Sequence, residues 1–330
     1  MKKVPHSTSR VLWQMGQALL PEHFFAQEES LREEMSLRIR LQRPLSWGVG
    51  SLEWDGFEIP KGVVSITELS LMLPSGTLID IPGNTAPAML NLKAAGNQAT
   101  VWVHLQSGFE KIHVGGRGEL AEENIERILQ KVELSTNSFS ETGAQSFKLA
   151  SFDCRPDGVW ELNTSYIPPL LAVGTSPFFE SIRARIESVI RMLRTVLLSE
   201  VQENYLAASS NSSGRIALRG LFALQALLVD LKAGIQCHPY DLFQALRSLY
   251  IDVCVHRDVL PGEIEKPYRH DDIAATFEPI LERLEEQAQA QRKARSRTPN
   301  SFAKTACFAV SWARIFAARK TFSCWCRNLR

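Results

Sequence analysis

Three histidines and three aspartates in the second half of the chain are the residues that could do chemistry together: His238, His256, His270, Asp258, Asp271 and Asp272. Such groups can bind a metal ion or transfer a proton in acid–base catalysis. Their spacing forms neither an H-x-x-x-H pair on one helix face nor an H-E-x-x-H motif. Helix capping accounts for them better, because His238 precedes a proline and Asp271 or Asp272 can accept from free helix N–H groups. The pattern therefore predicts no enzyme, no metal and no cofactor.

The composition of the chain is that of an ordinary globular protein. Its 330 residues are enough for two or three domains, and apolar and charged residues make up 45% and 22% of them. No apolar run approaches the ~20 residues that span a bilayer. The first ten residues lack the apolar stretch of a secretory signal, and the six cysteines are scattered, as is usual for reduced thiols. These features predict a cytoplasmic protein without direct membrane insertion.

Basic residues are concentrated near the C-terminal end. Residues 287–330 hold ten of the 37 basic residues and none of the 36 acidic ones. Such a tail is typical of nucleic-acid binding through phosphate groups, or of binding to an anionic membrane surface. A frameshift is a different interpretation, because codons for Ser301–Arg330 read two bases further on allow an alternating, acid-balanced strand sequence. We expect residues 294–330 to be an aberrant basic tail that replaces a C-terminal domain, and keep the nucleic-acid or anionic-membrane module as the alternative.

The first half of the chain changes from a helical to a strand period. Residues 1–20 have no amphipathic period and are expected to be extended. From Pro21 to about Leu41 apolar residues recur at helical spacing, which predicts a helix. From 45 to about 164 short runs with a period near two alternate with turn sequences rich in glycine and proline, which favours a β-sandwich. We expect the sandwich and its N-terminal helix to occupy residues 21–172.

A four-helix bundle is expected over residues 173–293. Ser176 and Pro177 are a plausible cap and first turn of its first helix, and residues 211–214 are expected to be a loop. The second helix, at 215–236, has an apolar face wide enough to pack on more than one partner helix. Further helices are expected to begin at His238-Pro239 and near Asp271. Five residues of the second helix are the predicted bundle and trimer contacts: Leu221, Phe222, Leu224, Leu228 and Leu231.

Several short motifs in this order resemble one known family. Seven residues near the start match its N-terminal pattern: Trp13, Gly16, Leu20, Pro21, His23, Phe24 and Gln27. Met15 and Phe25 depart from that pattern, which usually has Glu and Gln there. Four later matches are Trp47-Gly48-Val49-Gly50, Tyr166-Ile167-Pro168-Pro169, His238-Pro239 and Pro267-Tyr268-Arg269-His270-Asp271. Over about residues 10–293 the chain resembles the TssK family, also called ImpJ or VasE, of type VI secretion baseplate subunits.

The resemblance implies a structural protein of the α+β multidomain class. Its β-sandwich would be similar to the shoulder domain of phage receptor-binding proteins, its bundle would form the neck of a homotrimer, and the C-terminal β head domain would be missing here. The implied partners are the wedge proteins TssF and TssG, and in intact relatives the cytoplasmic parts of TssL and TssM. The implied location is the cytoplasm, at a baseplate docked to the inner membrane.

The N-terminal block supplies the candidate wedge contacts. These are Trp13, Gly16, Leu20, Pro21, His23 and Phe24. Trp13 lies in a segment without a period, so docking on a partner and packing on its own sandwich are equally open. Phe24, at the start of an amphipathic helix, is expected to pack in the core.

Overall fold

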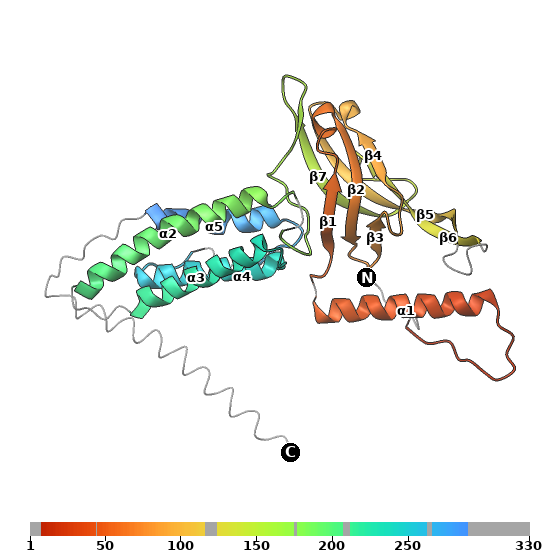
Figure 1. Cartoon of the computed structure of the whole chain (residues 1–330), viewed down its shortest axis with the longest axis horizontal. Helices are drawn as coiled ribbons and strands as arrows, with labels where there is room; N and C mark the ends of the chain where they lie inside the picture. The colour runs from red at the N-terminus through yellow and green to blue at the C-terminus, as the bar shows by residue number, and fades with distance from the viewer. Residues whose placement is uncertain are drawn as a thin grey trace, which may run out of the picture. The chain divides into compact units, whose positions relative to one another are not determined.

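The computed structural model describes residues 8–43, 45–115, 124–174, 177–206, 212–262 and 266–289. Within this part the chain folds into two antiparallel sheets and five longer helices (Figure 1). The α+β class expected from the sequence is therefore confirmed. The expected basic tail at 294–330 and the C-terminal domain that it would replace lie outside the described residues.

Eight strands form the two sheets in the described part of the chain. The first sheet contains β1 (Gly48–Trp54), β2 (Val63–Met72), β3 (Leu78–Ile81) and β4 (Ala88–Asn91), with β2 paired to each of the other three. The second contains β5 (Gln98–Gly115), β6 (Asn124–Ser135), β7 (Gly143–Cys154) and β8 (Trp160–Leu162), in the order β6-β5-β7-β8. The ring of Trp54 in β1 lies 5.6 Å from that of Phe152 in β7, so the two sheets share one core.

Strand β2 shows why a simple period of two only partly describes these sheets. Val64 and Ile66 are buried, and the alternation then slips by one residue, so that Leu69 and Leu71 are the next buried pair. The slip coincides with a register shift against β1 between Glu53 and Trp54. A β-bulge of this kind inserts one residue and restores the apolar side chains to the core face.

The helices are α1 (Pro21–Gln42), α2 (Glu180–Leu206), α3 (Ser212–Lys232), α4 (Pro239–His256) and α5 (Ile273–Gln289). The helix predicted from Pro21 is confirmed, as is the start of α4 at Pro239. Two predicted boundaries are wrong. Helix α2 begins three residues after Pro177, because Phe178 and Phe179 first turn into the core, where they are almost fully buried. Helix α3 begins inside the segment predicted as a loop, and it ends four residues before the predicted end.

Helices α2–α5 lie alongside one another and bury their apolar faces together (Figure 1). The capping predictions hold for two residues. The His238 Nδ1 accepts the Tyr240 N–H at 3.1 Å at the start of α4, and the Asp272 Oδ1 accepts the Ala275 N–H at 3.1 Å at the start of α5. Among the described helices, none is both long and apolar enough to cross a membrane.

The start of β1 lies directly against the segment that leads into the bundle. Val49 and Leu170 form a parallel bridge, in which the Val49 N–H donates to the Pro169 carbonyl at 2.8 Å. Gly48 has φ +118°, and a Cβ at this position would lie 2.4 Å from the Pro169 oxygen. Glycine is therefore needed at 48 for both its conformation and its lack of a side chain.

Gly48→Ala should lower the free energy of unfolding much more than Gly158→Ala. Gly158 also has a positive φ, of +82°, but a Cβ there would meet nothing within 4 Å. We expect about 1 kcal/mol for Gly158→Ala from conformation alone, and roughly 3 kcal/mol or more for Gly48→Ala from the added clash. Chemical denaturation measures both. Equal losses would show that the approach to Pro169 contributes nothing.

Candidate partner-binding surface and the joint beside it

Two buried histidines join the bundle to the chain that enters β1. The Nε2–H of His238 donates to the Leu45 carbonyl at 3.1 Å, and that of His270 donates to the Trp47 carbonyl at 2.7 Å. Because a carbonyl only accepts, both rings carry their proton on Nε2. Their Nδ1 atoms are then acceptors, as the bonds from the Tyr240 N–H and from the Tyr268 hydroxyl (3.0 Å) require. The rings stack at 5.1 Å.

Burial keeps both imidazoles of this histidine joint neutral. The pKa of His270 is lowered to about 4, mainly by loss of hydration, which outweighs the opposing bond to the Trp47 carbonyl, and to a lesser extent by the nearby His238. Burial likewise lowers the pKa of His238. A proton on either Nδ1 would remove an acceptor and place positive charge in the stack. The joint is therefore a structural contact that depends on the neutral form.

Asp271, which follows His270 in the chain, pairs with Arg269 at 3.6 Å, and Asp272 and His256 serve other contacts. Asp272 caps α5, and His256 lies in a separate buried cluster with Glu200 and Arg257. Within the described ranges, no group of three or more His, Cys, Asp or Glu side chains is arranged to hold a metal ion. These residues thus serve several different parts of the fold.

The cluster around Glu200 was missed by sequence reasoning. One carboxylate oxygen of Glu200, in α2, lies 3.0 Å from the His256 Nε2, and the other lies 3.2 Å from the Arg257 Nη2. Arg257 also donates to the Gln287 carbonyl of α5, and the His256 Nδ1 lies 3.3 Å from the Ser213 hydroxyl of α3. The Ser–His–Glu chain resembles a catalytic triad, but the His256 side chain is completely buried. The cluster ties four helices together.

The N-terminal block, which we define as residues 13–24, forms a small folded unit at the start of α1. His23 accepts the Leu20 N–H at 3.2 Å on Nδ1, and its Nε2 lies 3.0 Å from the Gln17 side-chain amide. The Trp13 ring packs against the rings of His23 (5.8 Å) and Phe24 (5.9 Å). The matching residue types therefore hold one another in place rather than packing into the sheets.

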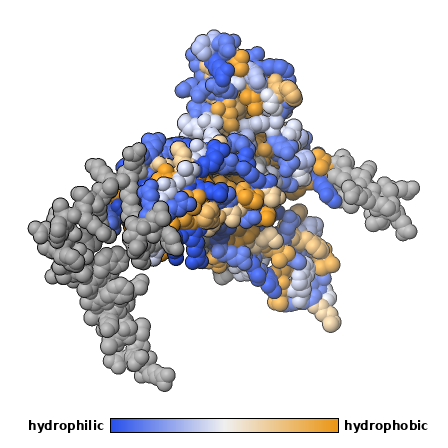
Figure 2. Space-filling view, turned by 60° about the vertical axis from the view of Figure 1, so that its left-hand side comes forward, coloured by the Kyte–Doolittle hydropathy of each residue, from blue (hydrophilic) through white to orange (hydrophobic). Residues whose placement is uncertain are grey.

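This block and α1 expose most of their apolar side chains. Trp13, Leu20 and Phe24 are 41%, 51% and 53% exposed, so the expectation that Phe24 packs in the core is wrong. Leu31 and Met35 continue the line of Phe24 along the outer side of α1, at spacings of seven and four, and are also exposed. Further exposed apolar residues nearby are Leu12, Met15, Leu19 and Phe25. Figure 2 shows hydrophobic residues among the hydrophilic ones on the face of the molecule that it draws.

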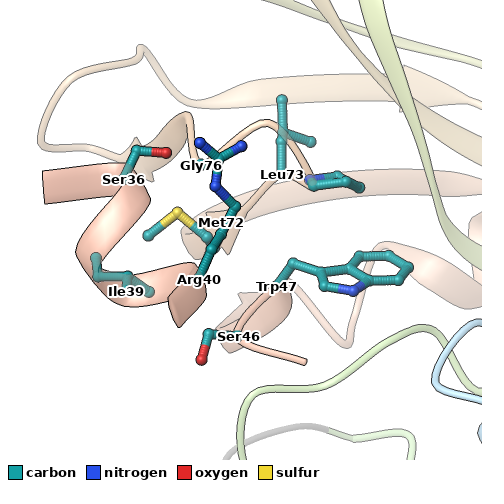
Figure 3. A pocket seen from close by; sticks show the side chains of 9 residues that line it. Ser36, Ile39, Arg40, Ser46, Trp47, Met72, Leu73 and Gly76 are labelled. Carbon is teal, nitrogen blue, oxygen red and sulfur yellow. The ribbon is translucent and has the colours of Figure 1, made fainter. Parts of the chain in front are cut away.

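Helix α1 rests on the β2–β3 turn through small and polar groups. The Ser36 hydroxyl donates to the Ser75 carbonyl at 3.1 Å, and a Cβ on Gly76 would lie only 1.8 Å from that hydroxyl oxygen. Beside this contact is a pocket of about 140 Å³. Figure 3 shows Ile39 and Arg40 of α1 facing Met72 and the turn across it. The two buried residues of α1 are serines, Ser30 and Ser36, so the inner side of the helix is the less apolar one.

The predicted contacts on α3 fall on opposite faces. Leu221, Leu224, Leu228 and Leu231 are at most 7% exposed and pack within the bundle of their own chain. Phe222 is 44% exposed. A contact between copies would therefore have to use the face of Phe222 and not that of the leucines.

The chain joins a two-sheet domain to a helical bundle and exposes an apolar block at its N-terminus, and exposed apolar patches commonly mark surfaces that bind other proteins. The chain belongs to the family described as "Bacterial Type VI secretion, VC_A0110, EvfL, ImpJ, VasE", whose model matches residues 23–112 and 116–297. The expected membership of the TssK (ImpJ/VasE) family is thus confirmed, and with it a structural role in the baseplate of type VI secretion.

Individual relatives agree with this assignment. The chain is 24% identical over 302 residues to the type VI secretion system baseplate component TssK1 of Pseudomonas aeruginosa, which covers 83% of this chain and 67% of that protein. Two solved structures share the fold. One is a TssK-TssF-TssG baseplate subcomplex (TM-score 0.70, 19% identity, 85% of this chain and 99% of that one). The other is a baseplate complex from the type VI secretion system (TM-score 0.71, 20% identity, 87% and 71%).

Acid should destabilise this protein through the histidine joint. A histidine whose pKa is lowered by folding contributes stability that is fully present above its unfolded pKa, near 6.5, and is lost as the pH falls toward the folded value. For His270, with a pKa of about 4, the loss should occur between about pH 6.5 and 4 and reach roughly 3 kcal/mol.

His270→Gln tests this origin, because the amide N–H can still donate to the Trp47 carbonyl but does not titrate. The variant should lose stability less steeply than the wild type between pH 6.5 and 5, measured by urea denaturation. Carboxylates titrate mainly below that window and affect both proteins alike. Identical slopes would rule out His270 as the source.

Proposed function

We propose that this protein is a structural subunit of the type VI secretion baseplate that binds the wedge proteins TssF and TssG through its N-terminal block. In this proposal the two sheets act as a shoulder domain and the bundle as the neck of a homotrimer, in the cytoplasm at a baseplate docked to the inner membrane. The protein works as a scaffold and not as an enzyme. A TssK relative is found with TssF and TssG in one of the matching structures, and this supports the two proteins as partners.

The observation that carries the proposal is the exposure of an ordered apolar block. Leu20 and Phe24 are about half exposed, and Trp13 is held against His23 and Phe24 by ring contacts. Exposed apolar groups that are fixed in place lose little freedom on binding, and this favours a contact surface. Tryptophans that become buried when an interface forms are among the residues that contribute most to the free energy of binding. The block has both properties, and its last two residues, His23 and Phe24, begin the segment that the family model matches.

A homotrimer would strengthen each of these contacts. Three copies of one modest surface on a single rigid body bind a multivalent partner far more tightly than one copy does, because the second and third contacts form within the complex. The contacts with TssL and TssM that intact relatives are expected to make involve a C-terminal domain outside the described residues. The nucleic-acid or membrane-binding alternative rests on the same undescribed part of the chain.

The double variant Trp13→Ala/Leu20→Ala should weaken capture of TssF and TssG by more than tenfold, since a buried tryptophan anchor typically contributes ~2 kcal/mol or more. Phe57→Ala is the matched control, because Phe57 is 86% exposed in the β1–β2 connection and belongs to no proposed surface. Pull-down with purified TssF and TssG measures the change.

The melting temperature of the double variant separates binding from stability. We expect it to stay within a few degrees of the wild type, as does that of Phe57→Ala. Normal capture by the double variant would overturn the N-terminal block as the wedge contact, as would an equal loss of capture in the control.

A further inference from the structure

The pocket between α1 and the β2–β3 turn has mostly apolar walls and one cationic side chain. Five of the residues that line it are apolar: Ile39, Trp47, Met72, Leu73 and Pro74. Arg40 and two serines supply the polar side chains, and none of the lining residues is acidic. Figure 3 shows the Arg40 side chain reaching toward the turn, where its Nη1 donates to the Ser75 carbonyl at 3.4 Å. A group that enters the pocket therefore meets hydrocarbon walls and a guanidinium.

The size of the pocket suits a single apolar side chain. Its volume is about 140 Å³, and an apolar cavity of about 150 Å³ can hold one benzene molecule. A phenylalanine, leucine or methionine side chain is of this size. The thioether of Met72 in the wall can adapt to the exact shape of such a group.

The walls of the pocket are held in place by contacts within the chain. The Gly76 N–H donates to the Leu73 carbonyl at 2.8 Å, and the Leu73 N–H donates to the Thr77 carbonyl at 2.9 Å, so the turn is closed by two backbone hydrogen bonds. The Trp47 ring lies 5.0 Å from the ring of His270 in the histidine joint. A pocket that is formed before binding loses little freedom when it is filled, and this favours affinity.

The exposed apolar line on α1 leads to this pocket. Phe24, Leu31 and Met35 form the line, and Ile39 follows Met35 at a spacing of four and lines the pocket. A helix rises 1.5 Å per residue, so the path from Phe24 to Ile39 is about 22 Å long. One segment of a partner that lies along α1 can therefore touch the N-terminal block at one end and the pocket at the other.

We propose that the pocket takes one apolar side chain of the TssF–TssG wedge, from a segment that lies along α1 and carries a carboxylate next to this anchor. The inference rests on the proposed wedge contact, and it adds a second anchor point and the chemistry of the group that fills it. Arg40 is the reason for the carboxylate, because a guanidinium has five N–H donors and can serve a carbonyl and a carboxylate together. A polar anchor is disfavoured, since it would lose hydrogen bonds to water among the apolar walls.

Ile39→Trp should lower capture of purified TssF and TssG by more than tenfold, because the indole takes the space of the anchor side chain. Ile128→Trp is the matched control: it is the same substitution at a position that is 57% exposed on β6 and lies outside the proposed surface. Ile39 is itself partly exposed, so both variants should melt within a few degrees of the wild type.

Arg40→Gln tests the charge separately from the shape of the pocket. The amide keeps an N–H donor but carries no charge, so capture should fall roughly three- to fivefold. Raising the salt concentration should weaken capture by the wild type more than capture by this variant, because the ion pair that salt screens is already absent. Arg155→Gln, at an exposed position in the β7–β8 turn, removes the same charge elsewhere and should leave capture and its salt dependence unchanged.

The outcomes distinguish this inference from the function on which it rests. Normal capture by Ile39→Trp, or an equal loss with Ile128→Trp, overturns the pocket as an anchor point. A salt dependence that Arg40→Gln leaves unchanged overturns the carboxylate. If Trp13→Ala/Leu20→Ala loses capture while both pocket variants bind normally, the pocket alone is overturned and the N-terminal block remains the wedge contact. A wild type that does not capture TssF and TssG overturns the proposed function, and the pocket inference with it.

Discussion

The fold depends on two neutral imidazoles that hold the backbone between α1 and β1. His238 belongs to the start of α4 and His270 to the approach to α5, yet both donate to carbonyls only two residues apart, at Leu45 and Trp47. An unpaired buried carbonyl would be costly, and so would a buried charge, so this contact requires neutral rings with the proton on Nε2. The same arrangement fixes the entry of β1, and with it the positions of α1 and of the first sheet relative to the bundle.

The family motifs after the N-terminal block contact one another at this joint, and these contacts give them a structural role. Gly48 lets the chain pass against Pro169, which comes from the Tyr-Ile-Pro-Pro segment. The His-Pro pair and the Pro-Tyr-Arg-His-Asp segment supply the two histidines. Tyr268 adds the hydroxyl that His270 accepts. Residues about 220 positions apart in the sequence, such as Trp47 and His270, therefore have to fit one another in shape and hydrogen bonding. The N-terminal block is the match that this joint does not explain, and its side chains are the exposed ones.

Periodicity was sufficient to predict the helices and the strand-rich region, because a helix or strand that covers a core repeats its apolar residues at 3.6 or 2. It could not predict the late start of α2, where Phe178 and Phe179 are buried in the core from a turn that precedes the helix. Nor could it predict the bulge that shifts the alternation in β2. The histidines could be assigned to caps but not to a shared stack, since nothing local in the sequence shows that two caps will meet. Glu200 carried no signal, because a single glutamate in a polar helix is ordinary.

Helix α1 shows why amphipathic spacing does not identify the surface that covers an apolar face. Its outward line of Phe24, Leu31 and Met35 has the spacing of a core-facing helix, while its inner side meets the β2–β3 turn through Ser36. A larger inner side chain would not fit, because Gly76 and Ser36 already touch. The periodicity thus indicates that one face of the helix is apolar. It does not indicate whether that face packs against the same chain or against another protein. In α3 the leucine face is covered by the chain's own helices, whereas Phe222 and Val229 on the opposite side are exposed. A protein that works by assembly retains such faces, and only the exposure in the folded chain distinguishes them from its core.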